Sequence, residues 1–500
     1  MPLHRLESLS TFYTHFRREP PKAHRIEVCR DLSCQLAGGP EACNRLKKAF
    51  DLDETIEIVE VSCLGRCDMA PAGAIGGQAI NTLTHSDIEH AIASRIPLEA
   101  PAPKRWDTMQ IYPKANERYG TLRETLGQEP SSLSATLEDS GLRGMGGAAF
   151  PTGRKWSLVA SAPAGPRHVI TNADESEPGS FKDREILSSL PHLVIEGMAL
   201  AGYCIGAERG TIFIRHEYGP ECKAIEAALL EAREMGALGQ GIFGSSFNFE
   251  IDVFVSPGGY ILGEETALLE CLEDKRGEPR NKPPFPGMVG LNGQPTLINN
   301  VETFAHATTI LHNGAEWWHE QGLDGFSGQK FMSVSGDVAR PGVHLVPCGT
   351  PLSKVLELCG GMQDDRKLGA IAPGGASSSF LPPSALQTGV DFQSITDAGS
   401  MLGSGGAVFI AADQDLLEVA LSVTRFFRNE SCGKCVPCRV GTEKAVALVE
   451  EAGGISSEIH TQLQQLHETL ARTSICGLGQ IALSPMLSLA ERFPNDVNGR

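Results

Sequence analysis

The first hundred residues alternate between short apolar runs and amphipathic stretches. The runs RIEVC and IEIVEVSC are separated and followed by the helical patterns GPEACNRLKKAF and HSDIEHAIASRI. Strands that alternate with helices are typical of a small α/β domain, which we predict at residues 23–97. Residues 1–22 are predicted to be a polar leader. The Pro-rich stretch PLEAPAPKR predicts a linker, which we place at 98–110.

A longer segment repeats this alternation. The apolar runs HVITNA, GTIFIR and DVFVSP have strand character, and ECKAIEAALLEAREMG has helical periodicity. We predict a larger, Rossmann-like α/β domain at residues 111–330.

The pattern changes twice more towards the C-terminus. KFMSVSGDVARPGVHLVPCGTPLSKVLELCGG contains two strand-like runs joined by a turn and then one helix. This order predicts a β-grasp (ubiquitin-like) module at 331–412. Beyond it, Leu417, Leu421 and Phe427 recur at helical spacing, as do Leu463 and Leu470. We therefore predict a helical bundle at 413–500, which makes the chain multidomain, α/β and then α.

Composition excludes some classes of function. The formal net charge of −18 disfavours binding to nucleic acid or to anionic membranes, because phosphates would repel the chain. No run approaches about 18 apolar residues, and the N-terminus lacks the apolar core of a secretory signal. We expect a cytoplasmic protein without membrane insertion. Its 14 cysteines then indicate metal or catalytic use rather than a disulfide framework.

Three cysteines near the C-terminus have CxxCxxC spacing, in ESCGKCVPCR. They could bind zinc, form a redox pair with a spare thiol, or hold an iron–sulfur cluster. A short CxxCxxC loop can bind three corners of a 4Fe-4S cubane, with the fourth thiolate supplied from elsewhere. We favour this cluster over zinc, with the ligands Cys432, Cys435, Cys438 and Cys476.

Four cysteines in the first domain form two separated pairs with CxxxxC and CxxxC spacing. This pattern fits neither a zinc finger nor a cubane well, and it suits a 2Fe-2S cluster. Reduced structural thiols are the open alternative. The residues are Cys29, Cys34, Cys63 and Cys67.

The stretch GLRGMGGAAFPTGRKW (141–156) contains five glycines. Glycine clusters let backbone N–H groups approach a phosphate, although the plain GxGxxG fingerprint is not met. Carboxylates follow in TNADESEPGSFKDRE (171–185), and amides in PTLINNVET (295–303). Alone, these segments could be a tight loop and a solvated acidic loop. Beside iron–sulfur ligands, they indicate a redox cofactor site.

Together with YILGEETALLE and SICGLG, these motifs resemble the NADH-binding flavoprotein family of 51 kDa-type subunits of respiratory NADH:quinone oxidoreductase and their soluble relatives. The resemblance covers about 135–485. The first domain, with VCRDLSC and VSCLGRCDMAPAG, is similar to the thioredoxin-like 2Fe-2S domain of a partner subunit in such enzymes, although its Cys34–Cys63 gap is shorter than usual.

The resemblance implies a set of cofactor contacts. Gly144, Gly146, Gly147 and Lys155 would contact the FMN phosphate. The ribityl chain and ring would meet Asn172, Asp174, Tyr260, Gly263, Glu264, Asn299 and Asn300. For NAD, Phe150, Phe181 and Phe285 would stack on the adenine, with Glu177 and Glu265 near the ribose and nicotinamide. The chain departs from the family at Met145, often Arg, and at Ala149, often Gly.

The resemblance is closest to the β (diaphorase) subunit of molybdenum-dependent NAD formate dehydrogenases. It implies that FMN converts single electrons from iron–sulfur clusters into hydride transfer to NAD⁺. The implied partners are a molybdenum-containing catalytic subunit with further clusters and a small thioredoxin-like 2Fe-2S subunit. Equivalent subunits of an NAD-reducing hydrogenase or of respiratory NADH:quinone oxidoreductase are the alternatives. A non-catalytic, zinc-binding assembly subunit is a rival of another class.

Overall fold

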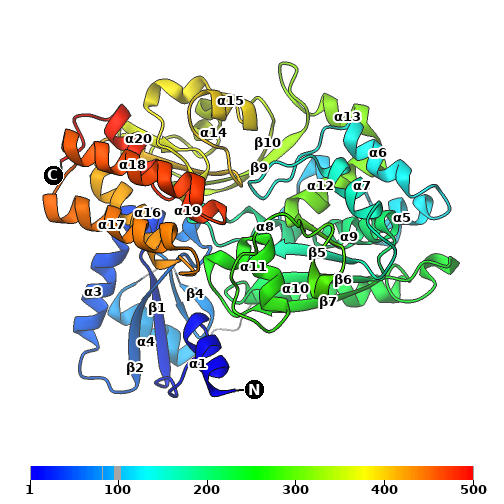
Figure 1. Cartoon of the computed structure of the whole chain (residues 1–500), viewed down its shortest axis with the longest axis horizontal. Helices are drawn as coiled ribbons and strands as arrows, with labels where there is room; N and C mark the ends of the chain where they lie inside the picture. The colour runs from blue at the N-terminus through cyan, green and yellow to red at the C-terminus, as the bar shows by residue number, and fades with distance from the viewer. Residues whose placement is uncertain (1, 81–82, 95–102, 499–500) are drawn as a thin grey trace.

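A computed structural model describes residues 2–80, 83–94 and 103–498. In these residues the chain forms three four-stranded sheets and a helical C-terminal region (Figure 1). Residues 98–102 of the predicted linker lie outside the described residues.

The first sheet belongs to the N-terminal domain and has the order β2-β1-β3-β4. Strands β1 and β2 are parallel, whereas β3 runs antiparallel to both β1 and β4. Its strands are β1 (His24–Cys29), β2 (Ile56–Val61), β3 (Gly73–Ile75) and β4 (Gln78–Ile80). Its helices are α2 (Leu32–Leu36), α3 (Gly39–Ala49) and α4 (His85–Ser94). Ile26 and Val28 alternate with polar residues along β1 and are fully buried in the core.

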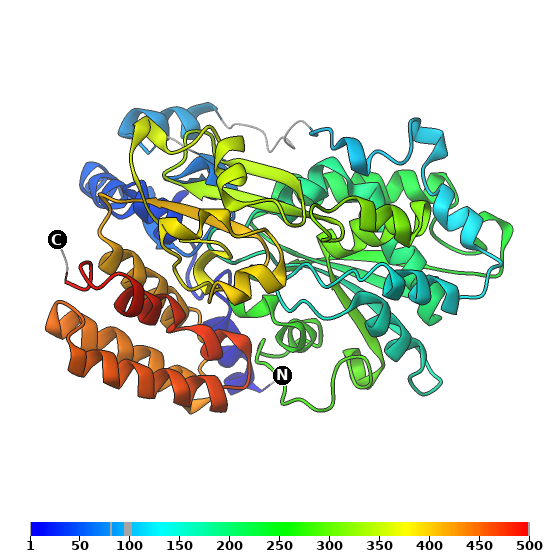
Figure 2. The same ribbon diagram turned by 90° about the horizontal axis from the view of Figure 1, so that it is seen from above.

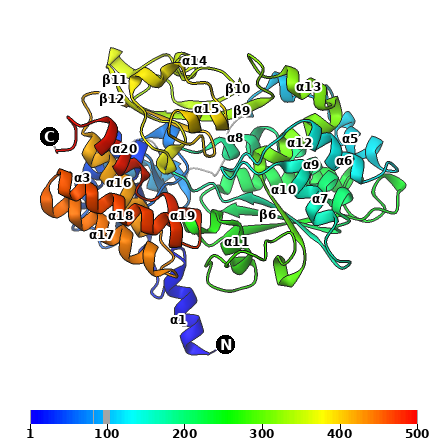
Figure 3. The ribbon, with the colours of Figure 1, turned by 45° about the horizontal axis from the view of Figure 1, so that its top comes forward.

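The segment before this sheet begins with helix α1 (Leu3–Phe12), which projects from the body of the molecule (Figure 3). Tyr13 follows the helix, is buried, and donates its hydroxyl hydrogen to the carbonyl of Lys275. The predicted polar leader is therefore attached to the second domain at Tyr13, whereas the helix before Tyr13 projects from the molecule.

The second sheet has the order β7-β6-β5-β8, and all its pairs are parallel. The strands are β5 (His168–Ala173), β6 (Arg209–Arg215), β7 (Glu250–Ser256) and β8 (Thr296–Asn300). The helices of this part of the chain are α5 (Gly120–Thr125), α6 (Ser131–Asp139), α7 (Thr152–Ala160), α8 (Lys182–Ser189), α9 (Pro191–Ile205), α10 (Gly219–Glu234), α11 (Glu265–Leu272), α12 (Val301–Asn313) and α13 (Ala315–Glu320). Chain order reverses between β5 and β8, and such a switch point opens a crevice at the carboxyl ends of parallel strands.

The third sheet has the order β10-β9-β12-β11, with β9 and β12 parallel and both edge strands antiparallel. It comprises β9 (Gln329–Gly336), β10 (Gly342–Pro347), β11 (Leu368–Ala372) and β12 (Gly406–Ala411), with helices α14 (Leu352–Leu358) and α15 (Phe392–Asp397). A parallel central pair flanked by antiparallel edges agrees with the predicted β-grasp module.

The C-terminal region is helical, and its long helices lie side by side in the view from above (Figure 2). The helices are α16 (Leu416–Asn429), α17 (Val436–Ala452), α18 (Ser457–Thr473), α19 (Gly477–Ile481) and α20 (Ser484–Arg492). Helix α16 also packs against α2 of the N-terminal domain, so the two cysteine-bearing ends of the chain meet.

Within the described residues, no single helix is long and apolar enough to cross a membrane. Helices α8 and α9 pass that test only when taken together, and they are bent by 93° at their junction.

Candidate functional site

The glycine-rich loop is closed on itself just before α7. The amide of Gly144 donates to the carbonyl of Phe150 at 2.9 Å, and the amide of Thr152 donates to the carbonyl of Leu142 at 2.8 Å. Gly147 has φ +115°, a conformation that suits only glycine. A Cβ at Gly146 would lie 3.0 Å from the Cβ of Asn300. The loop thus lies directly against the end of β8, at the switch point.

Polar side chains converge at the carboxyl ends of the two neighbouring strands. Asn172 and Asn300 are register partners in β5 and β8. The amide of Asn172 donates to the carbonyl of Gly263 at 2.8 Å, and Asn299 accepts from the indole of Trp156 at 3.3 Å. These bonds tie the glycine-turn segment and α7 to the strand ends.

Two buried oxygens at this edge have no hydrogen-bond partner among the described residues: Oδ2 of Asp174 and Oγ1 of Thr171. Burial raises the pKa of Asp174 to about 7, an effect that the Arg215 guanidinium partly offsets. Buried polar atoms without partners are costly, so they indicate a polar ligand. A glycine loop, a switch point and unpartnered oxygens fit a flavin nucleotide with its phosphate on the loop and its hydroxyls at the strand ends.

Two of the predicted contacts to the flavin ring, Glu264 and Asn300, are also N-caps of helices. Glu264 caps α11 by accepting from the amides of Thr266 and Ala267, both at 2.9 Å. Asn300 caps α12 through its Oδ1, and its Nδ2 donates to Asp183 at 2.6 Å.

Two lysines and two glutamates form a charged group at the mouth of the crevice. The ammonium of Lys282 lies 2.8 Å from Glu264 and 2.9 Å from Glu265. Lys155 donates to the carbonyl of Ile298 at 2.8 Å and lies 3.8 Å from Glu265. Burial lowers the pKa of Lys155. The sequence analysis did not identify Lys282 as a site residue. Lys282 lies outside every motif, and the loop that carries it returns to α11 only in the folded chain.

The three predicted adenine contacts differ in exposure. Phe150 and Phe285 are 41% and 58% exposed, as a stacking surface requires. Phe181 does not fit this role, since it is fully buried, precedes α8, and lies under the guanidinium of Arg184 at 5.4 Å. Leu158, exposed on α7, is a better candidate. Leu158 could have been identified from the sequence, because it is an apolar residue three positions after Lys155. The opposite face of the same helix is buried.

Glu177 is held by the β-grasp module. The amide and hydroxyl of Ser377 both donate to its Oε1 at 2.6 Å. Burial raises the pKa of Glu177, and hydrogen bonds from Ser377 and Tyr260 partly offset this. The third sheet therefore orients a carboxylate in the crevice.

A buried network supports the glycine loop from below. The ammonium of Lys330 lies 2.5 Å from Glu302 and 2.8 Å from the carbonyl of Ser404. Lys182 contacts Glu302 at 3.0 Å and Asp183 at 2.6 Å. Burial opposes ionisation of Glu302, but the two ammonium groups outweigh it and hold its pKa well below the usual range. Such paired charges fix the β-grasp module to the crevice.

The four N-terminal thiols are buried and lie together. Cys63 and Cys67 have sulfurs 3.5 Å apart, and Cys29 lies within hydrogen-bonding reach of Cys34 and Cys63. Backbone amides donate to three of the sulfurs: Gly65 to Cys63, Ala72 to Cys34 and Gly179 to Cys67, at 3.3–3.4 Å. Amides aimed at sulfur are what iron–sulfur ligands use to tune potential.

Buried arginines fix this thiol loop to the second domain. Arg215 donates to the carbonyl of Cys63 at 2.6 Å and to the carbonyl of Glu175. Arg184 donates to the carbonyl of Gly65 at 2.9 Å, and Arg66 pairs with Glu221 through two bonds of 2.9 and 3.1 Å. The thiol set thus lies directly against the loop that carries Glu175 and Glu177.

The C-terminal thiols lie at helix starts. Cys435 is the N-cap of α17 and Cys476 that of α19. Electrostatic coupling links Cys438 to Cys435 and Cys432, and Cys476 to Cys432 and Cys438, so the four form one group. A Cβ at Gly479 would lie 2.9 Å from the Cβ of Cys438, which explains the glycine. Among the described residues no set of three or more His, Cys, Asp or Glu is arranged around a single ion, whereas a cluster of several atoms needs wider spacing.

Glu430 lies two residues before the first cysteine of the CxxCxxC motif. It connects the C-terminal helical region to the N-terminal domain and to the glycine turn at Tyr260. It accepts from the hydroxyl of Ser62, beside Cys63, and from the amide of Tyr260 at 2.9 Å. The pKa of Tyr260 is raised well above its usual value by burial and by Glu177, with a smaller contribution from Cys476. One crevice therefore has a cysteine set on each side.

Comparison with protein-family models supports this organisation. Residues 1–95 match the thioredoxin-like [2Fe-2S] ferredoxin model, and residues 137–309 match the Nuo51 FMN-binding domain. Residues 331–380 match the SLBB domain, and 418–500 match the iron–sulfur binding region of NADH-ubiquinone oxidoreductase-F. The chain thus carries an FMN-binding domain, a 4Fe-4S-binding region and a thioredoxin-like [2Fe-2S] domain.

Curated relatives and solved structures agree. The chain is 43% identical over 385 residues to the F 2 subunit of NADH-quinone oxidoreductase of Rhizobium meliloti, covering 76% of this chain and 91% of that protein. It is 39% identical over 382 residues to the HndC subunit of the NADP-reducing hydrogenase of Solidesulfovibrio fructosivorans, covering 76% and 78%. A chain of the air-oxidised NAD⁺-reducing [NiFe]-hydrogenase superposes with a TM-score of 0.86 at 29% identity, covering 99% of this chain and 88% of that one.

Proposed function

The chain belongs to the NADH-quinone oxidoreductase family of FMN- and iron–sulfur-binding flavoprotein subunits, and from this premise we propose that it is the diaphorase subunit of an NAD-dependent formate dehydrogenase. Membership of this family makes the chain a subunit of the NADH dehydrogenase type. The family also binds NADH.

The observation that carries the role of the crevice is its position between two cysteine sets, with unpartnered Asp174 and Thr171 oxygens at its base. When bound, FMN can exchange electrons in pairs with NAD(H) and singly with iron–sulfur clusters. The glycine loop and Lys155 would hold its phosphate. Asn172, Asp174 and Asn299 would orient its ribityl chain and ring.

The remaining residues would bind the nicotinamide nucleotide. Phe150, Phe285 and Leu158 offer exposed apolar surface for the adenine. Glu177, fixed by Ser377, and Glu265, fixed by Lys282, would orient the ribose and nicotinamide. No side chain needs to move a proton for hydride transfer, so these residues act by positioning and by excluding water.

The proposed electron donor is a molybdenum-containing, formate-oxidising subunit with further clusters, assisted by a small thioredoxin-like 2Fe-2S subunit. Fusion of a thioredoxin-like domain to the flavoprotein in one chain supports this. We propose that the complex works in the cytoplasm, where thiols are kept reduced. An NAD-reducing hydrogenase is the second candidate, favoured by the superposition over 99% of this chain.

Metal analysis of the native assembly separates the candidates. Isolation through a tag on this chain, followed by quantitation of molybdenum, nickel, iron and flavin, should give molybdenum with formate-dependent reduction of NAD⁺. Nickel with hydrogen-dependent reduction would favour the second candidate. Zinc without iron or flavin would instead support the non-catalytic assembly role.

A further inference from the structure

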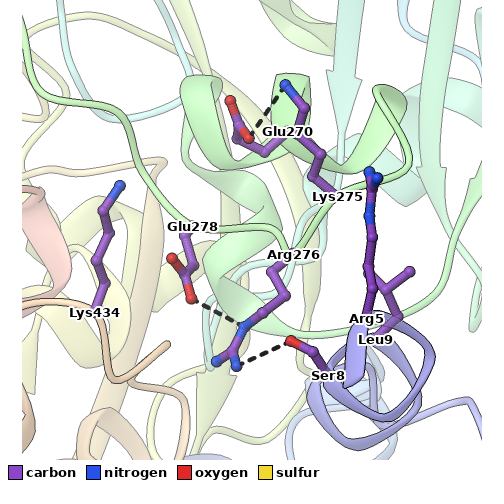
Figure 4. A pocket seen from close by; sticks show the side chains of 8 residues that line it. All are labelled: Arg5, Ser8, Leu9, Glu270, Lys275, Arg276, Glu278 and Lys434. Atoms are coloured by element: carbon purple, nitrogen blue, oxygen red, sulfur yellow. Dashed lines mark hydrogen bonds and ion pairs between the residues drawn. The ribbon is translucent and has the colours of Figure 1, made fainter. Parts of the chain in front are cut away.

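A pocket of mixed charge lies where the projecting helix α1 meets the body of the molecule. It has a volume of about 270 Å³ (Figure 4). Its walls come from α1, from α11 and the segment that follows it, and from the loop before α17. Its charged lining consists of the cations Arg5, Lys275, Arg276 and Lys434 and the carboxylates Glu270 and Glu278. None of these side chains belongs to the flavin or nicotinamide contacts, so the pocket is a separate site.

Two of the four cations are neutralised by neighbouring carboxylates. Arg276 pairs with Glu278 at 2.9 Å, and Lys275 pairs with Glu273 at 2.6 Å. The positive charge that remains therefore belongs to the other two cations, one on α1 and one in the CxxCxxC loop.

These two cations, Arg5 and Lys434, lie on either side of Arg276 in the close view (Figure 4). Within the described part of the chain, neither has a carboxylate at ion-pair distance. Lys434 donates one of its three N–H groups to the carbonyl of Pro279 at 2.6 Å, which leaves two for a ligand. In a chain of net charge −18, two unpaired cations on one pocket indicate an anionic ligand.

The pocket also offers groups that suit hydroxyls. The hydroxyl of Ser8 accepts from Arg276 at 3.4 Å and keeps its own hydrogen to donate. Glu270 pairs with Arg280 at 2.5 Å and Glu278 pairs with Arg276, but a carboxylate has about four lone-pair sites, so each can accept more bonds. Carboxylates repel a bare anion and bind sugar hydroxyls. The lining therefore favours a ligand that carries both an anionic group and hydroxyls.

We propose that this pocket binds a phosphate monoester of a sugar or nucleoside. Arg5 and Lys434 supply the charge that the phosphate requires, and the two carboxylates accept from the hydroxyls. A phosphate monoester carries about −1.5 to −2 charges at pH 7, which matches two unpaired cations. Small-molecule sites commonly measure about 300–1,000 Å³. A pocket near the lower limit suits a sugar phosphate or mononucleotide and is too small for a dinucleotide. This site does not depend on the partner proposed above.

Binding of such a ligand connects the start of α1 to the C-terminal cysteine loop. The end of α1 is already held, since the guanidinium of Arg276 lies 4.7 Å from the ring of Phe12, whereas the start of the helix projects (Figure 3). Arg276 also donates to the carbonyl of Cys432 at 3.5 Å. A ligand shared by Arg5 and Lys434 therefore restrains the first turn of α1, and hydrogen exchange reports this restraint.

The test uses the full-length chain loaded with its flavin and clusters, with NAD⁺ added to fill the dinucleotide site. Isothermal titration calorimetry measures the binding of ribose 5-phosphate, AMP, inorganic phosphate and ribose, and hydrogen exchange locates it. The variants are Arg5→Gln and the charge-conserving Arg5→Lys. The control is Arg45→Gln, which changes an exposed arginine on α3 of the N-terminal domain.

Ribose 5-phosphate or AMP should bind and should slow exchange in residues 3–12 and 430–440. The tighter of the two identifies a sugar ester or a nucleoside ester. Arg5→Gln should weaken binding roughly tenfold or more, because a charge-assisted hydrogen bond is lost. Arg5→Lys should lose less, and Arg45→Gln should match wild type. Inorganic phosphate and ribose should each bind at least tenfold more weakly than the ester.

Four results would overturn the proposal. The first is that neither ester binds, and the second is that inorganic phosphate binds as tightly as the esters. The third is equal affinity of wild type and Arg5→Gln for the ester. The fourth is slower exchange only in segments outside residues 3–12 and 430–440.

Discussion

The two cysteine sets of this chain occupy opposite kinds of environment. All four N-terminal thiols are buried, whereas three of the four C-terminal thiols are partly exposed. The N-terminal loop is fixed by Arg215 and Arg184 of the second domain. The C-terminal loop borders the pocket that Arg5 and Lys434 line.

This difference in burial indicates with which groups each cysteine set can exchange electrons. A closed set in contact with the Glu175–Gly179 loop is placed to exchange electrons within the chain. An open set beside positive charge is placed to exchange them with another protein. The crevice between them is where the two routes meet.

The largest effect is expected from removing a ligand on the open side. Cys435→Ala should cut electron transfer from NADH to a protein acceptor by more than about 100-fold, because loss of one ligand disrupts the cluster. Reduction of bound flavin by NADH should persist in anaerobic stopped-flow measurements. Cys222→Ala, a cysteine outside both sets, is the control. Equal loss of flavin reduction would contradict separate routes.

On the closed side, Arg215→Met should release the N-terminal loop. Arg215 is buried and pairs with Glu217 at 2.8 Å, and breaking a buried pair costs about 3–5 kcal/mol. Because each 1.4 kcal/mol is tenfold, hydrogen exchange in residues 62–68 should accelerate by roughly 100-fold or more. Exchange in residues 430–440 should not change.

Arg209→Met, on the same strand but exposed, is the matched control. A uniform acceleration over both loops would show that Arg215 stabilises the whole molecule rather than the closed side.

The closed side should also depend on pH through Glu175. Its carboxylate accepts from Ser180 and from the amides of Asp183 and Arg184, and burial raises its pKa to about 7. The folded state therefore binds this proton more tightly than the unfolded state, whose pKa is about 4.3. The resulting stability is fully present below about pH 4 and is lost as pH rises towards 7.

Wild type should accordingly lose stability relative to Glu175→Gln between pH 5 and pH 8, by up to about 3 kcal/mol at 1.36 kcal/mol per pKa unit. Differential scanning calorimetry of both proteins checks this. Glu357→Gln, an exposed carboxylate, should show no such trend, and a pH-independent difference for Glu175→Gln would refute the assignment.

A smaller effect is expected in the shared crevice. Glu177→Gln should lower NADH turnover about tenfold, a cost of about 1.4 kcal/mol, with flavin content unchanged. Ser377→Ala should act in the same direction, since Ser377 orients Glu177. Steady-state kinetics with ferricyanide measure both. Glu234→Gln, exposed on α10, is the control, and unchanged kinetics in both crevice variants would remove Glu177 from the site.

The smallest effect concerns Ala149 in the glycine-rich loop. Its φ of +53° is left-handed, which costs an L-residue roughly 1–2 kcal/mol. Ala149→Gly should therefore be neutral or stabilising by up to about 1 kcal/mol, after allowing for the greater unfolded-state freedom of glycine. Thermal unfolding measures it. Ala227→Gly, exposed within α10, should instead destabilise by about 1 kcal/mol, and equal losses would show that the loop is unstrained.

Much of the architecture could be predicted because its signals are local. Short apolar runs predicted β5 to β7, helical spacing predicted α16 and α18, and cysteine spacing separated the two thiol sets. The crevice was predictable because its glycines, carboxylates and amides lie in short motifs. These signals depend on neighbours in the sequence.

The remaining features depend on contacts between distant segments. Phe181 looks like a stacking aromatic in its loop, but Ser333 and Arg184 hold it in the interior. The residues 1–22 look like a leader, but Tyr13 meets Lys275. Lys282 and Ser377 reach the crevice from outside its motifs. Burial of an aromatic ring and pairing across more than a hundred residues leave no pattern in the chain itself.

The most direct test of the account is an anaerobic NADH titration of the isolated chain, followed by electron paramagnetic resonance with flavin and iron quantitation. The account predicts one flavin per chain and two distinct reduced iron–sulfur signals, one from a four-iron and one from a two-iron centre, without any partner. An iron-containing chain in which NADH reduces neither centre, or a colourless chain that stays inert after reconstitution, would contradict it.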